Sequence, residues 1–369
     1  MARIDSFLRM VVDQGASDLH FHAGTKPVIR YIGDLVPLPF RKLTEDETRR
    51  FLTEIMSSEQ RATFEREQEV DFAYVVPGVG RFRVNVFTQS RGMSAVFRVI
   101  ADRPVSIDAL RLPAVTRKLA ALRAGLVLVT GPTGSGKTTT LSAIISEINQ
   151  TSRRHIITIE DPIEYIHQPA QSVITQRELG AHTNSASDAL RAALREAPDV
   201  LVVGELRDFE TISLALSAAE TGVLVLGTLH TNSAAKAIDR LVSACPEDQQ
   251  TQIVGVLSVL LKGVIAQHLC KLATGDGRIA IIEVLLQSYA VSNLIRENKV
   301  HQIDGYLQSS EHADGSSQSL DKALFEYLKE GIILLDDALG LANEPATLKD
   351  WMADLDRERR MAFQSGAQS

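Results

Sequence analysis

The segment 131–138 could bind a phosphate group, because its residues fit the pattern G-x-x-x-x-G-K-[ST]. Its glycines let backbone N–H groups turn toward phosphate oxygens, Lys137 would reach the β- and γ-phosphates, and the Thr138 hydroxyl would ligate Mg²⁺. The segment lies between a predicted strand and a predicted helix, as this chemistry requires. We therefore predict that ATP and Mg²⁺ are cofactors, with the nucleotide bound by Gly131, Pro132, Thr133, Gly134, Ser135, Gly136, Lys137, Thr138 and Thr139.

Two acidic groups follow predicted strands and are candidates for the hydrolytic chemistry. Glu160, Asp161 and Glu164 come at and after the apolar run 156–160, and Glu205 follows the run 200–203. The carboxyl ends of parallel strands share one edge of a sheet with the phosphate loop. Carboxylates there could orient a water molecule or support the magnesium shell. The spacing alone leaves open which glutamate is the general base.

A histidine and several arginines complete the set of candidates. His230 ends the run 223–229, so its imidazole would lie near the γ-phosphate if that strand neighbours the phosphate-loop strand. Guanidinium groups stabilise charge on a transferring phosphoryl group and often come from another domain or subunit. The arginines considered for this role are Arg81, Arg83, Arg98, Arg191, Arg195 and Arg207.

The elements that must position these residues fall into two patterns. After residue 113, continuous apolar runs alternate with helical stretches, as expected of parallel strands covered on both faces. The helix after the phosphate loop shows one buried stripe, Leu141, Ile144, Ile145 and Ile148. We predict an α/β domain with a mostly parallel sheet, its strands at 126–130, 156–160, 200–203, 223–228 and 279–284.

The first hundred residues predict a smaller α+β domain. A helix at 4–12 ends near Gly15, and period-two alternation predicts strands, interrupted by one helical stretch from Thr44 to Glu65. Prolines flank the aperiodic segment 101–113, and 305–319 is polar and rich in Gly and Ser. The predicted domains are therefore 1–100, a linker at 101–113, an ATPase domain with C-terminal helices at 114–345, and a charged, disordered tail at 346–369.

Composition excludes several classes of function. Among 369 residues, 39 Lys and Arg against 46 Asp and Glu give a net charge of −7, and 5% are aromatic, so a nucleic-acid channel has little support and no nucleic-acid partner is expected. The two cysteines, Cys245 and Cys270, cannot form a four-cysteine zinc site. Neither a membrane-spanning run nor an export signal is visible, so we expect a cytoplasmic protein.

The chain resembles the secretion ATPase superfamily, specifically the type IV pilus retraction ATPases of the PilT type. The resemblance covers residues 6–345 and rests on segments such as ASDLHFHAGTKPVIRYIGDL, VTGPTGSGKTTTL, TIEDPIEYIH, LRAALREAPDVLVVGELRD and GTLHTNSAAKAIDR. It implies a homo-hexameric ring whose subunits join a PAS-like N-terminal domain to a RecA-like ATPase domain, with nucleotide between them. It also implies a location peripheral to the inner membrane, a pilus platform protein as partner, and a paralogous pilus ATPase as a further candidate partner.

The resemblance also implies roles for individual residues. Glu164 in TIEDPIE is similar to the water-activating base, and Glu205 in VVGE to the Walker B acid that acts on Mg²⁺ directly or through water. His230 matches the family's His box. Arg83 and Arg98 match arginines that the N-terminal domain extends toward the phosphates. With Lys137, these form the predicted catalytic set.

Alternatives to retraction remain open at this point. An extension or type II secretion ATPase usually carries a four-cysteine zinc insertion, which this chain lacks, and no zinc is expected. Two departures from the family pattern leave open an accessory PilT-like paralogue: Ser292 replaces an arginine within 290–296, and the segment 315–319 is Gly-Ser-Ser-Gln-Ser. A DNA-transfer motor is the third alternative.

Overall fold

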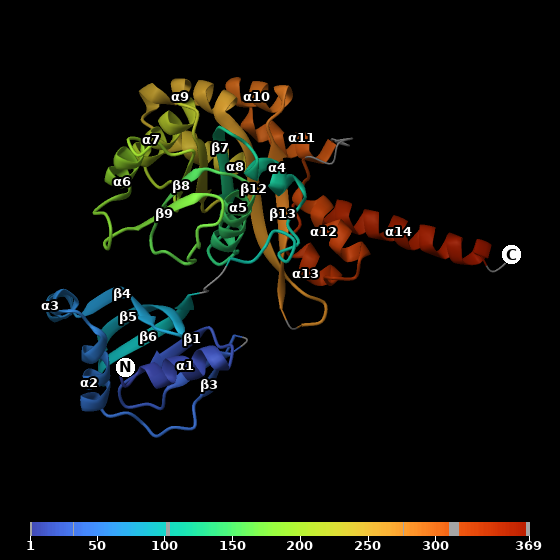
Figure 1. The fold of residues 1–369 in the computed structure, drawn as a ribbon. Helices are drawn as coiled ribbons and strands as arrows, with labels where there is room; N and C mark the ends of the chain where they lie inside the picture. Colours follow the sequence, from blue (N-terminus) through green and yellow to red (C-terminus); the bar gives the residue numbers. More distant parts are fainter. Residues whose placement is uncertain (1, 32, 101–103, 276, 310–316, 367–369) are drawn as a thin grey trace. The chain divides into compact units, whose positions relative to one another are not determined.

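The computed structural model describes residues 2–31, 33–100, 104–275, 277–309 and 317–366 (Figure 1). Contacts between Cα atoms divide the chain into two compact units. The first comprises residues 1–103 with 164–166, and the second comprises 104–163 with 167–369. Each unit is described by itself.

The first unit is an antiparallel sheet with three helices. The strands run, in sheet order, β3 (Asp34–Pro37), β2 (Val28–Tyr31), β1 (Asp18–Phe21), β6 (Gly92–Ile100), β5 (Gly80–Gln89) and β4 (Glu69–Val76). The helices are α1 (Asp5–Asp13), α2 (Glu45–Ile55) and α3 (Ser58–Glu67). The single helix predicted from Thr44 to Glu65 is wrong, because Met56 is extended and Ser57 starts α3 with its own capping box.

The second unit is built on a seven-stranded sheet in which only β13 runs antiparallel to its neighbour. The sheet order is β13 (Arg278–Leu286), β12 (Leu261–Lys271), β7 (Gly125–Thr130), β11 (Leu224–Leu229), β10 (Val200–Val203), β8 (His155–Glu160) and β9 (Val173–Glu178). The predicted α/β class with a mostly parallel sheet is confirmed. Strands β9 and β12 were not predicted from the sequence.

Helices cover both faces of this sheet. Along β7, Leu126 and Leu128 pack on one face, and Val127 and Val129 on the other, as the period of two requires. Helices α4 (Val115–Ala120) and α5 (Lys137–Thr151) cover the second of these faces. The first is covered by α6 (Ala186–Ala193), α7 (Phe209–Glu220), α8 (Ala234–Ser243), α9 (Glu247–Leu260), α10 (Tyr289–Arg296), the 3₁₀ turn η1 (Val300–Gln302) and α11 (Ile303–Ser309).

The last helices pack against the ends of β12 and β13. They are α12 (Leu320–Lys329), α13 (Leu335–Leu339) and α14 (Pro345–Gly366), which extends away from the rest of the unit in Figure 1. The predicted tail at 346–369 is therefore helical as far as Gly366. Leu348, Trp351 and Met352 fall at helical spacing, and the Trp351 and Phe325 rings meet edge-on with centroids 5.6 Å apart.

Two other segments differ from expectation. Of the predicted linker 101–113, residues 104–113 belong to the second unit, because Ile107 and Leu112 are buried in its core. The predicted loop 305–319 begins inside α11, and 310–316 lie outside the described residues, as does part of the unusual 315–319 segment. Over the described ranges, none of the helices combines the length and the apolar character that crossing a bilayer demands.

Candidate active site

The phosphate loop connects β7 to α5 in a compact, closed form. Gly131, Gly134 and Gly136 have φ angles of +149°, +77° and +86°, which residues with a Cβ rarely adopt. The Lys137 ammonium donates to the carbonyl oxygens of Gly131 at 2.8 Å and Pro132 at 3.0 Å. The lysine therefore folds back over the loop, where its charge would face a bound phosphate.

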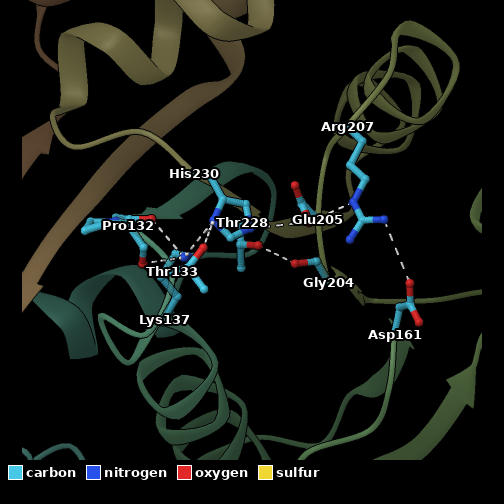
Figure 2. Close-up of polar contacts among 10 residues, drawn as sticks. Pro132, Thr133, Lys137, Asp161, Gly204, Glu205, Arg207, Thr228 and His230 are labelled. Carbon is cyan, nitrogen blue, oxygen red and sulfur yellow. Dashed lines mark hydrogen bonds and ion pairs between the residues drawn. The ribbon is translucent and has the colours of Figure 1, made fainter. Parts of the chain in front are cut away.

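His230 and Glu205 lie beside this loop because their strands are neighbours. β11 pairs with β7, as the role predicted for His230 required, and β10 pairs with β11. His230 Nδ1 is 3.4 Å from both Lys137 Nζ and Thr133 Oγ1, and its Nε2 is 3.4 Å from Glu205 Oε2. Figure 2 shows the imidazole between the loop and the carboxylate. Sequence positions 133, 137, 205 and 230 thus form one polar cluster.

Arg207 extends the cluster on the far side of Glu205. Its Nε donates to Glu205 Oε2 at 2.8 Å, and its Nη1 is 3.9 Å from Asp161 Oδ2 (Figure 2). The hydrogen bond to Glu205 and that carboxylate's charge raise the pKa of Arg207. Arg207 was one of the six arginines that the sequence offered as candidates, and it was not distinguished from the others. Its position two residues after Glu205 was the available signal.

Gly204 lets the Glu205 segment approach β8. A Cβ at Gly204 would lie 3.1 Å from the carbonyl oxygen of Ile159, tighter than nearly all real contacts of this kind. The Thr228 hydroxyl also donates to the Gly204 carbonyl oxygen. The Gly-Glu dipeptide therefore has a steric reason in this structure: the glycine fits between two strands and leaves the glutamate at the sheet edge.

The loop that carries Glu164 is held by β9. Ile163 N donates to the buried carboxylate of Glu178 at 3.0 Å, and His167 N donates to Gln176 Oε1 at 2.9 Å. The His167 Nε2 and Ser142 Oγ atoms, 3.3 Å apart, connect the same loop to α5. Burial lowers the pKa of His167 to about 4, so this imidazole is neutral at pH 7. Glu164 itself is exposed and falls within the first unit.

Arg83 and Arg98 also lie in the first unit, as register partners on β5 and β6. Arg98 Nε donates to Asp18 Oδ1 at 2.8 Å, and Arg83 Nε is 3.8 Å from Asp71 Oδ1. Burial of Asp18 opposes ionisation, but the hydrogen bonds from Arg98 and Ser17 outweigh it and lower the pKa of that carboxyl. The roles of both arginines at the phosphates stay predictions.

A cavity of about 620 Å³ lies beside the start of α5. Gly136, Thr139 and Thr140 line one end of it, and Arg111 and Arg278 lie among its other walls. Its volume is within the range of small-molecule sites, which is about 300–1,000 Å³. Thr139 thus faces a space next to the phosphate loop rather than only the helix core.

Gln267 was not among the site residues predicted from the sequence. This residue is buried in β12, and its side-chain amide contacts Ser135 of the phosphate loop and Thr140 of α5. The only sequence signal was a polar residue inside the apolar run VIAQHL. A buried amide needs hydrogen-bond partners, so such a residue points to a specific contact.

A sequence profile of the type II/IV secretion system proteins matches residues 1–334. The chain belongs to this family. It is 45% identical over 342 residues, which are 93% of this chain and 98% of the relative, to the type IV pilus retraction ATPase PilT of Pseudomonas aeruginosa. It is 39% identical over 345 residues, 94% of this chain and 90% of the relative, to the type IV pilus ATPase PilU of the same species.

The fold of this family member is also similar to a solved structure, that of the pilus retraction motor PilT with bound ADP. The two superpose with a TM-score of 0.88 at 43% identity, covering 95% of this chain and all of the other. Family membership and the α/β fold are thus confirmed.

Proposed function

We propose that the chain is an ATP-hydrolysing motor that powers type IV pilus retraction. The observation that carries the proposal is the cluster of Lys137, His230 and Glu205 at the ends of three neighbouring strands. Likeness to PilT over nearly the whole chain supports the retraction function. The nucleotide's phosphates would bind at residues 131–138, and its base and ribose would enter the adjoining cavity.

The residue roles belong to the same proposal. Glu164 activates the attacking water, and Arg83 and Arg98 stabilise charge on the phosphoryl group. The His230 imidazole, which contacts both the loop and Glu205, lies near the γ-phosphate of bound ATP. The Thr138 hydroxyl and the Glu205 carboxylate are oxygen donors of the kind that Mg²⁺ prefers, so these residues would hold the ion. Bound there, Mg²⁺ would supply positive charge against the phosphate oxygens.

Assembly and partners extend the proposal beyond one chain. Six copies form a ring at the cytoplasmic side of the inner membrane and act on a pilus platform protein. Nucleotide drives the motor through its different affinities for the open and closed forms of each subunit. Product release then reopens the subunit and passes the motion on. Mass in solution with and without ATP tests the six-fold assembly.

A second candidate function is that of an accessory ATPase assisting another retraction motor. The similarity to PilU and the serine at position 292 on α10 favour it. The two functions separate in a deletion strain of the source organism. Loss of twitching with surface pili retained, restored by this chain alone, supports the main motor. Retained twitching would support the accessory role, and loss of the pili would point to extension.

The site assignment is tested by Lys137→Ala and Glu205→Gln. We expect Lys137→Ala to lose ADP binding, because the variant removes the ammonium group that lies over the loop and would face the phosphates. Glu205→Gln should bind nucleotide but lose most Mg²⁺-dependent turnover. Arg41→Ala, at an exposed ion pair of the first unit, is the control and should leave turnover unchanged. Wild-type hydrolysis by either site variant contradicts the assignment.

A further inference from the structure

The phosphate loop packs against β12, a strand that carries no recognised nucleotide motif. A Cβ at Gly131 would lie 2.3 Å from the carbonyl oxygen of Gln267, and one at Gly136 would lie 2.9 Å from Gln267 Nε2. The backbone of Gln267 therefore excludes a Cβ at Gly131, and its side-chain amide would have to move to admit one at Gly136. Contact this close makes Gln267 part of the wall of the loop.

The Gln267 amide bridges the loop and the helix that follows it. Its Nε2 donates to the Ser135 carbonyl oxygen at 2.6 Å, and its Oε1 accepts from the Thr140 hydroxyl at 2.6 Å. A backbone carbonyl can only accept, so the amide orientation is fixed by chemistry. The Thr140 hydroxyl must then be the donor. All three groups are buried away from water, so each of these hydrogen bonds takes the place of one that the group would make to water in the unfolded chain.

The bridge determines where one phosphate-binding N–H points. Ser135 C=O and Gly136 N–H belong to the same planar trans peptide, so they point in opposite directions. Holding the carbonyl toward β12 therefore turns the Gly136 N–H away from β12. That N–H belongs to the last residue before α5, where the backbone and the helix dipole favour an anion.

We propose that Gln267 is a positioning residue for nucleotide recognition, which orients the 135–136 peptide so that Gly136 N–H binds a phosphate oxygen. The proposal rests on the proposed nucleotide site at residues 131–138. The Gln267 side chain does not replace Lys137 or Thr138 in contacting phosphate. It fixes in advance a peptide that would otherwise have to be ordered by the nucleotide itself.

The test compares ADP affinity among purified full-length variants by calorimetry. Gln267→Met keeps the side-chain length but removes both bonds, and Gln267→Glu keeps the acceptor but cannot donate to Ser135. Each should weaken ADP binding about tenfold, the effect of one lost buried hydrogen bond. Thr140→Val, which leaves the Ser135 bond in place, should weaken it less than about threefold. Thr140→Val should have no added effect in the Gln267→Met background.

Gln318→Met is the matched control. Gln318 Nε2 donates to the Ile282 carbonyl oxygen at 2.8 Å, so this variant also removes an amide-to-backbone bond near the sheet. It should lower the melting temperature without changing ADP affinity. If folded Gln267→Met or Gln267→Glu binds ADP as wild type does, Gln267 is only structural and the inference is overturned. If Lys137→Ala keeps ADP affinity, the proposed nucleotide site itself is wrong.

Discussion

The contacts of Glu205 indicate most about the chemistry of the candidate active site. Its carboxylate contacts His230 on one side and Arg207 on the other, and one-quarter of its side chain is exposed, at 25%. The charge-assisted hydrogen bond from Arg207 Nε, 2.8 Å long, holds the orientation of the carboxylate. We therefore expect Arg207 to act on the proposed magnesium site through Glu205, which it contacts directly.

Removing the hydrogen bond from Arg207 to Glu205 should slow ATP turnover without preventing nucleotide binding. We expect Arg207→Ala to lower kcat about tenfold while the KM for ATP changes less than about threefold, since one charge-assisted hydrogen bond is lost. Arg207→Lys should recover part of the rate, because lysine restores the charge but not the fixed guanidinium geometry. Steady-state ATPase kinetics measure both constants. A rise in KM with unchanged kcat would mean that Arg207 contacts the substrate instead.

At the scale of elements, the three loop glycines differ in what surrounds them. Gly134 has a positive φ angle but nothing within 4 Å of an added Cβ, whereas Gly131 would meet the β12 backbone. Gly134→Ala should therefore cost only the backbone strain, about 1–2 kcal/mol. Gly131→Ala adds a clash that no side chain can relieve and should cost about 3 kcal/mol or more.

Urea unfolding of the two variants measures this difference. Because both substitutions add one methyl group to the same loop, each serves as the other's control. Equal losses of stability would show that φ alone determines the requirement for glycine. We expect the unfolding midpoint of Gly131→Ala to lie clearly below that of Gly134→Ala.

The elements also show how far sequence could predict the site. The phosphate loop, Glu205 and His230 were predictable because each follows a strand whose apolar run is continuous. β12 was not, since Gly263 and Gln267 interrupt its pattern and α9 runs into it at Leu260. The contact of Gln267 with Ser135 spans 132 positions and depends on β12 pairing beside β7. Local periodicity contains no information about such a pairing.

The same limit applies to the ends of the second unit. The 346–369 segment is rich in charge, which predicted a disordered tail, yet α14 forms because three apolar side chains find a partner in α12 and its neighbours. Amphipathic helices gain most of their stability from such packing rather than from composition. The aperiodic residues 104–113 likewise join the core through a few apolar side chains: Ile107 and Leu112 are buried in it, and Leu110 packs against it.

At the scale of the whole second unit, two buried titratable groups have opposite effects on how stability changes with pH. Burial lowers the pKa of His167 to about 4 and raises the pKa of Glu283 on β13 to about 7. Glu283 accepts from the backbone N–H of Ala234 at 2.8 Å and also from that of Leu320, so it joins the starts of α8 and α12. The nearby acids Asp304 and Asp321 raise its pKa further.

These shifts have opposite effects on stability. Unfolded His167 takes up a proton below its ordinary pKa of about 6.5 while the folded imidazole stays neutral, so its contribution is lost as the pH falls from 6.5 toward 4. Unfolded Glu283 releases a proton above about 4.5 while the folded carboxyl keeps it, so its contribution is lost as the pH rises toward 7. Between pH 4.5 and 6.5 the two contributions offset each other.

Single variants should reveal the pH dependence of stability that the two groups cancel in the wild type. With Glu283→Gln, the free energy of unfolding should rise by about 3 kcal/mol, relative to wild type, between pH 4.5 and 6.5, because the opposing contribution of Glu283 is removed while that of His167 remains. With His167→Gln it should fall by a similar amount over the same range. Urea unfolding at a series of pH values gives these curves, and the double variant, which lacks both groups, should return to the wild-type slope. Parallel curves for all four proteins would mean that neither group is held away from its ordinary pKa by the fold.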